Sequence, residues 1–377
     1  MSTPTPPPPS SPSLPWRLSS SVIMGLTGSI SRGFLYGLNH MDVTGLDRFL
    51  ETLDRRRDPE TRDRGLITVS NHVSVVDDPL MWGVLPLRYS LDPGNHRWSM
   101  GSYDICFQSK FTTAFFNLGQ VLPTHRIHTG SKFGGLFQPV MTQAIRLLSS
   151  QPFAKAPTPF TPNAETSDPF STGALTYSTN GVDCFTAPSA FPSRRHSWIH
   201  IFPEGRIHQH PQKTLRYFKW GISRLILESE PLPEIIPIFI DGNQDVMHES
   251  REFPRFLPRA GKKIRIAFGE TLDGEKVFGE LRERWRKLVD LQKEALSKKD
   301  LETNWEMGEL TEGLKYGKEA VELRNEVTFK IRQEVLKVRR SLGYPDEDPK
   351  QGLVETWLEE GDTGTGRKKD GSWVGDT

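Results

Sequence analysis

The segment Leu66-Ile-Thr-Val-Ser-Asn-His-Val-Ser-Val-Val-Asp-Asp-Pro79 passes from a short apolar run to a polar loop and then to a proline. The apolar run 66–70 is typical of a buried strand. Pro79, followed by Leu80, Met81 and Trp82, is typical of a helix start, because proline fits the first helical turn. The segment therefore predicts a strand, a loop and a helix in direct succession.

The same alternation continues along the chain. Further apolar runs at 197–202, 235–240 and 264–268 are each followed by turns that contain glycine or proline, as strands are. Helical periodicity appears between them at 138–149 and 215–228. Strands that alternate with helices predict an α/β fold, in which helices flank a sheet.

His72 and Asp77 lie in the loop of the opening segment. If Pro79 is the first helical residue, Asp78 is the N-cap and Asp77 stays outside the helix, where it can fold back to His72. A carboxylate that accepts from one imidazole nitrogen leaves the other nitrogen as a general base. The pattern indicates a catalytic pair; for an isolated His and Asp, a histidine beside a helix cap is the more common alternative.

Two further turns add polar residues at strand ends. Phe202-Pro-Glu-Gly-Arg206 follows one apolar run directly, and Gly119-Gln-Val-Leu-Pro-Thr-His-Arg126 ends another. Open α/β sheets bind ligands at such positions, and arginine suits phosphate. An ordinary surface turn and a solvated arginine are the alternatives. The candidate phosphate-binding residues are Glu204, Gly205, Arg206 and Arg126.

Pro237 interrupts the apolar run 235–240. Because proline cannot donate to a strand ladder, it predicts an edge strand or a bulge. We expect this strand to border a substrate groove.

Two segments have the pattern of helices at a membrane surface. The first, 16–40, places an apolar residue at every fourth position from Val22 to Leu38. The second, 215–228, has an apolar face, with Arg216, Lys219 and Arg224 placed to meet anionic headgroups. For both segments, a helix packed on the protein core is the alternative.

Composition excludes several classes of function. Lys+Arg 48 against Asp+Glu 47 leaves a net charge of +1, which gives no indication of nucleic-acid binding. Two cysteines cannot form a disulfide framework or a cysteine-based zinc site. His208 and His210 have no obvious carboxylate partner, so we expect neither a metal nor a cofactor.

The chain divides by composition into five parts. We expect a disordered Pro-rich N-terminus (1–15), a membrane-interface helix (16–40), a core domain (41–275), a charged helical region (276–342) and a disordered tail (343–377). A low-complexity insertion, 151–195, interrupts the core, and we expect it to carry no chemistry. No secretory signal or Arg-rich transit peptide is visible, so any targeting is internal.

In this order, His72-x-x-x-x-Asp77, Gly119 to Arg126, Phe202 to Arg206 and Ile236-Pro237 resemble the four motifs of the glycerolipid acyltransferase family. The flanking residues resemble its tafazzin branch, notably Asp104-Ile-Cys-Phe107, Phe218-Lys-Trp-Gly-Ile222 and Phe253-Pro-Arg255. The resemblance covers about 60–150 and 195–275. The runs after Thr124 and after Pro237 depart from the tafazzin pattern, which affects Arg126 and the shape of that sheet edge.

The resemblance implies a glycerol-3-phosphate-acyltransferase-like fold with a mixed sheet and membrane-interface helices. It implies a coenzyme A-independent transacylase that moves acyl chains between phospholipids and lysophospholipids and remodels cardiolipin. His72 would be the base and Asp77 its orienter. The implied partners are cardiolipin, monolysocardiolipin, phosphatidylcholine and a membrane surface. The implied location is mitochondrial membranes facing the intermembrane space, with peripheral or monotopic attachment.

Two other functions stay open on the sequence. An acyl-CoA-dependent lysophospholipid acyltransferase would use the same four motifs with a different donor. A catalytically inactive membrane scaffold would keep the fold without the chemistry. The sequence also leaves the oligomeric state open.

Overall fold

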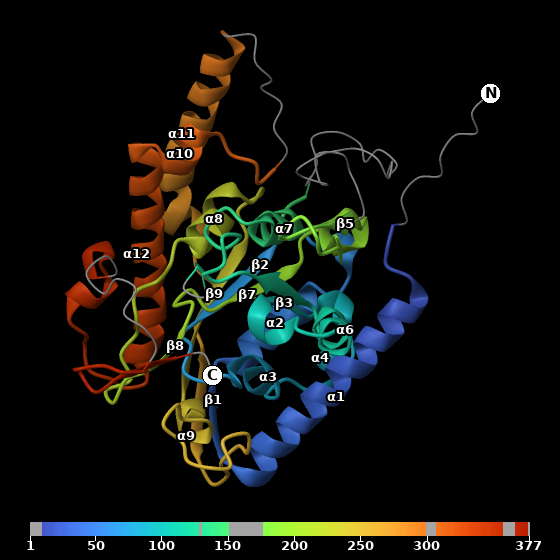
Figure 1. Cartoon of the computed structure of the whole chain (residues 1–377), viewed down its shortest axis with the longest axis vertical. Helices are drawn as coiled ribbons and strands as arrows, with labels where there is room; N and C mark the ends of the chain where they lie inside the picture. Colours follow the sequence, from blue (N-terminus) through green and yellow to red (C-terminus); the bar gives the residue numbers. More distant parts are fainter. Residues whose placement is uncertain (1–9, 128–129, 151–175, 299–306, 357–365, 376–377) are drawn as a thin grey trace.

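The computed structural model describes residues 10–127, 130–150, 176–298, 307–356 and 366–375. A sheet passes through the middle of the molecule, with helices on both of its faces (Figure 1). The predicted α/β class with a helix-flanked mixed sheet is confirmed. The expectations for 1–9, 151–175 and 357–365 concern residues outside this description.

The main sheet has seven strands within the described residues, in the order β1-β10-β9-β2-β7-β3-β4. Strands from β9 to β4 are parallel, whereas β10 is antiparallel to β9 and parallel to β1. The apolar runs predicted to be strands all belong to this sheet. The strands are β1 (His40–Thr44), β2 (Leu66–Ser70), β3 (Arg97–Ser102), β4 (Val121–Thr124), β7 (Trp198–Ile201), β9 (Glu234–Asp241) and β10 (Lys263–Phe268).

Alternating side chains divide the core into two layers, one on each face of the sheet. In β9, Ile235 and Phe239 face one layer, and Ile236, Ile238 and Ile240 face the other, as the two-residue period of a strand requires. The first layer packs against α7 (Pro139–Leu148), α8 (Gly221–Glu228), α10 (Gly274–Ser297) and α12 (Lys318–Ser341). The second packs against α1 (Leu14–Leu38), α2 (Leu46–Arg55) and α3 (Asp77–Trp82).

Shorter elements connect these layers. The short helices are α4 (Leu87–Ser90), α5 (Tyr103–Cys106), α6 (Lys110–Leu118), α9 (Asn243–Val246) and α11 (Glu312–Tyr316). The short strands are β5 (Thr176–Tyr177), β6 (Phe185–Thr186), β8 (Ile207–Gln209), β11 (Gly366–Arg367) and β12 (Trp373–Gly375).

The position of Pro237 differs from the prediction. Its strand, β9, lies between β2 and β10 and is not at an edge. Pairing with β10 ends at Ile238, opposite Phe268, and the Pro237 carbonyl then accepts from the Gly269 amide at 2.8 Å. Proline is tolerated here because it stands just beyond the end of the antiparallel ladder, where its carbonyl is used and no donor is required.

The segment 215–228 is not a membrane-interface helix. The helix α8 begins only at Gly221, and its apolar residues are in the core, with Ile222, Leu225 and Ile226 fully buried. Arg224 is buried as well and pairs with Glu228 at 2.6 Å. The amphipathic pattern could not distinguish a helix against the sheet from a helix against lipid, because both need one apolar face.

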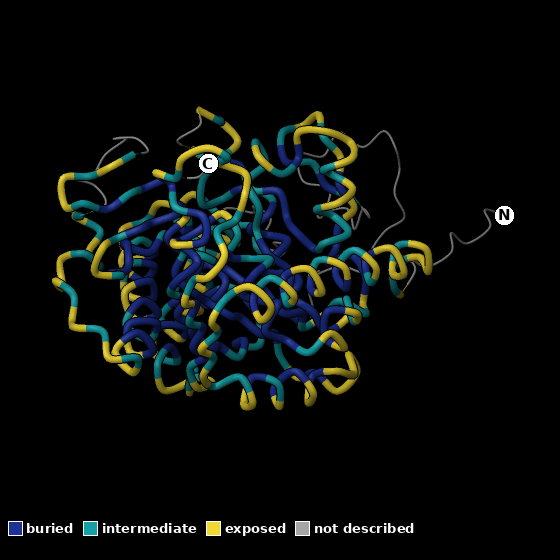
Figure 2. The backbone as a smooth tube through the Cα atoms, turned by 90° about the horizontal axis from the view of Figure 1, so that it is seen from below, coloured by how far each residue is buried: buried dark blue, intermediate teal, exposed yellow. Residues whose placement is uncertain are grey.

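The helix α1 exposes the apolar face that the four-residue spacing predicted. Val22, Leu26 and Ile30 are 64 %, 57 % and 64 % exposed, whereas Leu35 is fully buried against the core. Figure 2 shows exposed residues recurring along this helix. Among the described helices, none combines the length and the apolarity needed to cross a bilayer.

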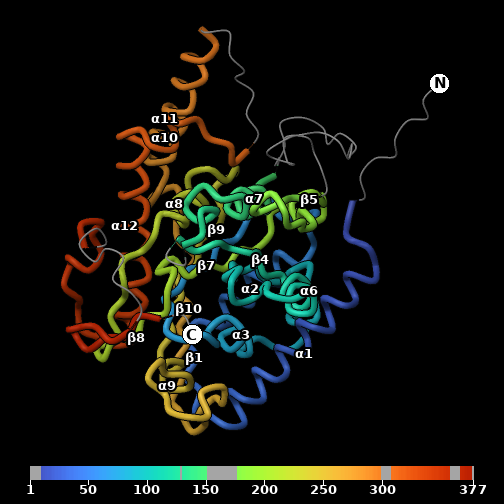
Figure 3. The backbone as a smooth tube through the Cα atoms, in the orientation of Figure 1, coloured from blue at the N-terminus to red at the C-terminus, as the bar shows by residue number. Residues whose placement is uncertain are grey.

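Two segments expected to be irregular contain packed residues. In the second half of the insertion, Tyr177 and Phe185 are buried beside Phe107 and Val121. In the tail, β12 pairs with β8 and buries Val374, so this part of the tail packs beside β8 (Figure 3). Few apolar residues lie in these segments, but some of them are covered by distant parts of the chain, whereas Val182 stays 91 % exposed.

The different environments along α1 can be tested by substitution. Leu26→Gln should change the free energy of unfolding by less than about 0.5 kcal/mol, because the side chain is already exposed. Leu35→Ala should lower it by about 2–5 kcal/mol. Denaturant unfolding measures both values. Equal losses would contradict the exposed position of Leu26.

Candidate active site

His72, in the loop after β2, meets Asp77, which is the first residue of α3. The imidazole Nδ1 donates to Asp77 Oδ2 at 2.8 Å. A carboxylate oxygen can only accept, so Nδ1 carries the proton and Nε2 is left as the base in the neutral ring. The structure thus forms the pair that the sequence suggested, with the orientation that general-base chemistry needs.

The Asp77 carboxylate is fully buried and surrounded by donors. Its Oδ2 also accepts from the backbone amides of Val73 at 2.6 Å and Ser74 at 2.8 Å. Its Oδ1 accepts from Asn243 Nδ2 at 2.9 Å. These contacts hold the carboxylate in one position, which in turn fixes the His72 ring.

The helix start differs from the prediction. Helix α3 begins at Asp77 with Val76 as its N-cap, so Asp78 is not the cap and Pro79 is not the first helical residue. Proline is still accommodated, because the first-turn amides have no partner within the helix. Asp78 instead accepts from Trp82 Nε1 at 3.1 Å and forms a salt bridge with Arg97.

Aromatic residues fix the outer face of the imidazole. Phe202 stacks on His72 with ring centroids 4.5 Å apart, and His200 meets Phe202 edge-on at 4.4 Å. The His72 carbonyl accepts from the His208 amide at 2.8 Å, which joins the loop to the start of β8. His72 is therefore held by its side chain, its ring face and its backbone.

His72 opens into a cavity of about 590 Å³. One wall is apolar and comes from α1, α5 and α6, including Ile23, Ile105 and Phe115. Ile105 and Phe115 are 46 % and 37 % exposed, so this wall continues to the protein surface. The cavity therefore joins a general base to an apolar opening beside α1, an arrangement that suits an acyl chain.

Cations lie at the polar end of the cavity. Arg126, Arg97 and Lys219 line it, and Arg126 pairs with Asp104. Gly205 and Ile207 also line it, whereas Arg206 between them does not. Arg206 is 8 % exposed and forms no hydrogen bond or ion pair within the described part of the chain. A buried guanidinium without a counter-charge is suited to an anionic ligand.

Glu204 occupies a different place from the one expected of a phosphate-binding residue. It is 1 % exposed, and its Oε2 has no partner among the described residues. Burial raises its pKa to about 8, against the lowering effects of Arg216, Arg332 and the backbone of His72. The Glu204 carboxyl is therefore a buried group whose pKa is sensitive to the His72 backbone and to two arginines.

Sequence reasoning missed several residues of the site. Asn243, at the start of α9, completes the donors to Asp77, although it lies far from the loop in sequence. Its position just after β9, at the strand ends where ligands bind, was the one available signal. Arg97 and its partner Asp78 were missed as cavity residues. Within the described residues, no cluster of His, Cys, Asp and Glu could hold a metal ion.

Glu204→Gln should remove a pH dependence from the stability of the protein. The folded chain keeps the Glu204 proton up to about pH 8, whereas the ordinary pKa is 4.5. The folded state then binds more protons in this window, so the free energy of unfolding falls as pH rises, by at most about 1.4 kcal/mol per pH unit. Denaturant unfolding across this range should show the variant gaining stability relative to the natural protein. If the difference in free energy of unfolding between the variant and the natural protein did not change with pH, the raised pKa of Glu204 would be contradicted.

Comparisons with known proteins show the family of this chain. A family model described as Acyltransferase matches residues 41–241. The tafazzin of Saccharomyces cerevisiae is 33 % identical over 91 % of this chain and 83 % of its own length. Taffazin of Dictyostelium discoideum is 28 % identical over 69 % of this chain and 71 % of its own length. Tafazzin of Drosophila melanogaster is 28 % identical over 72 % of this chain and 56 % of its own length. The chain is an acyltransferase and belongs to the tafazzin family.

Proposed function

We propose that this protein is a coenzyme A-independent transacylase that moves acyl chains from phospholipids to lysophospholipids. The observation that carries the proposal is the oriented His72–Asp77 pair at the end of an apolar cavity that reaches the surface. Cardiolipin remodelling on mitochondrial membranes is the biological form of this reaction that membership of the tafazzin family favours.

The proposed reaction needs one base. His72 Nε2 takes the proton from the hydroxyl of a lysophospholipid while that oxygen attacks the ester carbonyl of the donor phospholipid. When the donor C–O bond breaks, the imidazolium returns the proton to the departing oxygen. Asp77 stabilises the imidazolium between these events. One ester forms as another breaks, so neither a thioester nor water is consumed.

Headgroup binding is assigned to the cationic end of the cavity. Arg206 has no counter-charge in the described chain, whereas the charge of Arg126 is partly balanced by Asp104. Lys219 on the cavity wall would meet a lipid phosphate first, and Arg206, between the lining residues Gly205 and Ile207, is the second cation that we assign to it. Glu204 is assigned to support of the His72 loop instead of to the phosphate, because it is 1 % exposed and does not line the cavity.

The exposed face of α1 would bring this cavity to a membrane surface. Ile23, Met24 and Thr27 of α1 line the cavity, while Val22 and Leu26 beside them are exposed. A helix that inserts its apolar face into the bilayer interface would place the cavity opening where acyl chains lie. This supports peripheral or monotopic attachment, for which we propose the mitochondrial membrane surface that faces the intermembrane space.

The catalytic proposal is tested by lipid exchange without a thioester. Purified protein incubated with phosphatidylcholine and monolysocardiolipin should produce cardiolipin, measured by mass spectrometry. His72→Ala should lower the rate by about 10²–10⁴-fold, because the general base is lost. Asn243→Ala should cause a smaller loss, since it removes one donor to Asp77. His40→Ala, at an exposed position on the edge strand β1, is the matched control and should keep full activity.

Two results would reject this proposal in favour of the alternatives. Transfer that occurs only when acyl-CoA is supplied would make the protein an acyl-CoA-dependent acyltransferase. Exchange that persists at the natural rate in a folded His72→Ala variant would remove the catalytic role of this residue and leave the scaffold function.

Membrane attachment through α1 is tested by vesicle co-sedimentation. The double variant Leu18→Gln/Leu26→Gln should bind phosphatidylcholine–cardiolipin vesicles about tenfold or more weakly, because each buried methylene contributes about 0.8 kcal/mol. Leu291→Gln is the control, since Leu291 is 60 % exposed on α10, away from the cavity. Equal weakening by both variants would contradict a specific role for α1.

A further inference from the structure

Helix α12 carries three arginines that are almost completely buried, and two of them bind the same short segment of the chain. Arg332 and Arg339 are 1 % and 0 % exposed and are seven positions apart, so they lie on the same face of the helix. The helix follows the region 41–241 that the family model covers. Burying two cations is costly unless each finds acceptors, and both find them in the segment before α8.

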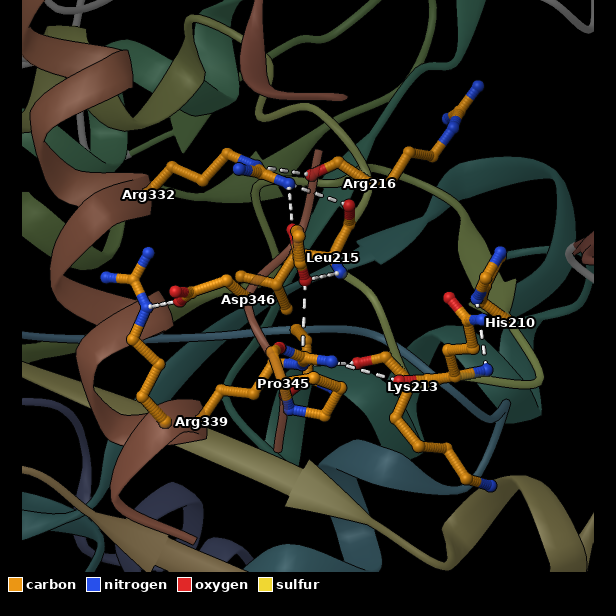
Figure 4. Close-up of polar contacts among 12 residues, drawn as sticks. His210, Lys213, Leu215, Arg216, Arg332, Arg339, Pro345 and Asp346 are labelled. Carbon is orange, nitrogen blue, oxygen red and sulfur yellow. Dashed lines mark hydrogen bonds and ion pairs between the residues drawn. The ribbon is translucent and has the colours of Figure 1, made fainter. Parts of the chain in front are cut away.

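These arginines bind the backbone of residues 212–216 (Figure 4). Arg332 donates from Nε to the Arg216 carbonyl at 3.0 Å and from Nη2 to the Leu215 carbonyl at 2.8 Å. Arg339 donates from Nε to the Lys213 carbonyl at 2.8 Å and from Nη2 to that of Gln212 at 3.0 Å. Residues 213–216 lie outside helices and strands, so these carbonyls have no regular ladder to satisfy them.

Glu347 supplies the counter-charge between the two arginines. It lies 2.7 Å from Arg332 Nη2 and 3.5 Å from Arg339 Nε. Its Oε1 also accepts from the Leu215 amide at 2.6 Å. Arg332, Arg339 and Glu347, which we call the α12 clamp, thus hold both the carbonyls and an amide of the same short segment.

The segment held by the clamp forms hydrogen bonds to Glu204. The Arg216 amide donates to Glu204 Oε1 at 3.3 Å, and Arg216 Nη1 donates to the Glu204 carbonyl at 3.4 Å. Glu204 belongs to the turn that follows Phe202, whose ring stacks on His72 with centroids 4.5 Å apart, and the His72 backbone lowers the Glu204 pKa. A continuous set of contacts therefore runs from α12 through residues 212–216 and Glu204 to the catalytic loop.

We propose that the α12 clamp is a set of positioning residues for catalysis. It fixes the position of Glu204 relative to the His72 loop and sets the charge environment of Glu204. This inference rests on the proposed general-base role of His72. It assigns a function to the charged C-terminal helix beyond covering the sheet. The clamp residues touch no substrate and act through Glu204.

A purely structural role would look similar in a simple loss-of-activity experiment, so a matched variant is needed. Arg324 is also on α12 and is also fully buried. It donates to the carbonyls of Leu314 and Lys315, which belong to α11 and lie outside residues 212–216. Arg324→Gln should therefore cost stability of the same kind as Arg332→Gln without disturbing Glu204.

The test measures thermal stability together with kcat and KM across pH. Arg332→Gln should lower kcat by on the order of tenfold to a hundredfold through misplacement of the site. One step in the pH profile of kcat is assigned to Glu204 because it is missing in Glu204→Gln. In Arg332→Gln this step should move to higher pH, because the Arg332 cation, which lowers the Glu204 pKa, is gone. Arg324→Gln should keep the natural kcat and the natural step when both are normalised to folded protein.

Two further variants give opposite and intermediate results. Glu347→Gln removes a negative charge near Arg332 and should move the same step to lower pH. Arg332→Lys keeps the charge but not the forked contacts, so it should keep the step in place while restoring only part of kcat. If Arg332→Gln does not fold, Glu347→Gln and Arg332→Lys still test the proposal.

The clamp proposal would be overturned if Arg332→Gln and Arg324→Gln had the same kcat and if the Glu204-dependent step stayed at the natural pH in both. Absence of acyl transfer by the natural protein would instead reject the proposed function. In that case the pH dependence of unfolding still tests the clamp: Arg332→Gln should extend the Glu204-dependent fall in stability to higher pH, whereas an unchanged range would overturn the proposal.

Discussion

The buried carboxylate of Asp77 is the group around which the rest of the site is arranged. It is removed from water and receives donors from His72, Val73, Ser74 and Asn243. An ionised carboxylate in the protein interior is tolerated only with such donors. Because they come from two strand ends, β2 and β9 must be adjacent and in register. Asn71 reinforces this alignment by exchanging two hydrogen bonds of 2.8 Å with the backbone of Ile240.

Buried arginines have a related role at the periphery. Arg282, Arg324, Arg332 and Arg339 each donate to backbone carbonyls in irregular segments or at helix ends. A guanidinium group offers several donors in a fixed plane, so it can satisfy neighbouring carbonyls that no strand reaches. The charged C-terminal helices are thereby joined to the sheet domain by directional contacts as well as by apolar packing. This explains how a sequence rich in charge can form part of the core.

The two helices with membrane-like patterns have opposite environments. Helix α8 is enclosed between the sheet and the C-terminal helices, so its apolar face contributes to the core. Helix α1 crosses the outside of the molecule beside α3, α4 and α6, and its apolar residues remain exposed next to the cavity opening. Amphipathicity was equally clear in both sequences. Packing partners from distant parts of the chain determined which helix kept an open apolar face.

The sequence alone determined the strands 66–70, 197–202, 235–240 and 264–268, the α/β class and the pairing of His72 with Asp77. These depend on local periodicity and on short separations along the chain, and both can be seen in the sequence. Tertiary structure decided the contribution of Asn243 and the central position of β9. It also decided the burial of Glu204 and the packing of the tail near Glu347. Each of these depends on contacts between residues far apart in the chain. The local sequence pattern does not reveal such contacts. A residue is buried or hydrogen-bonded by partners that only the folded chain brings next to it.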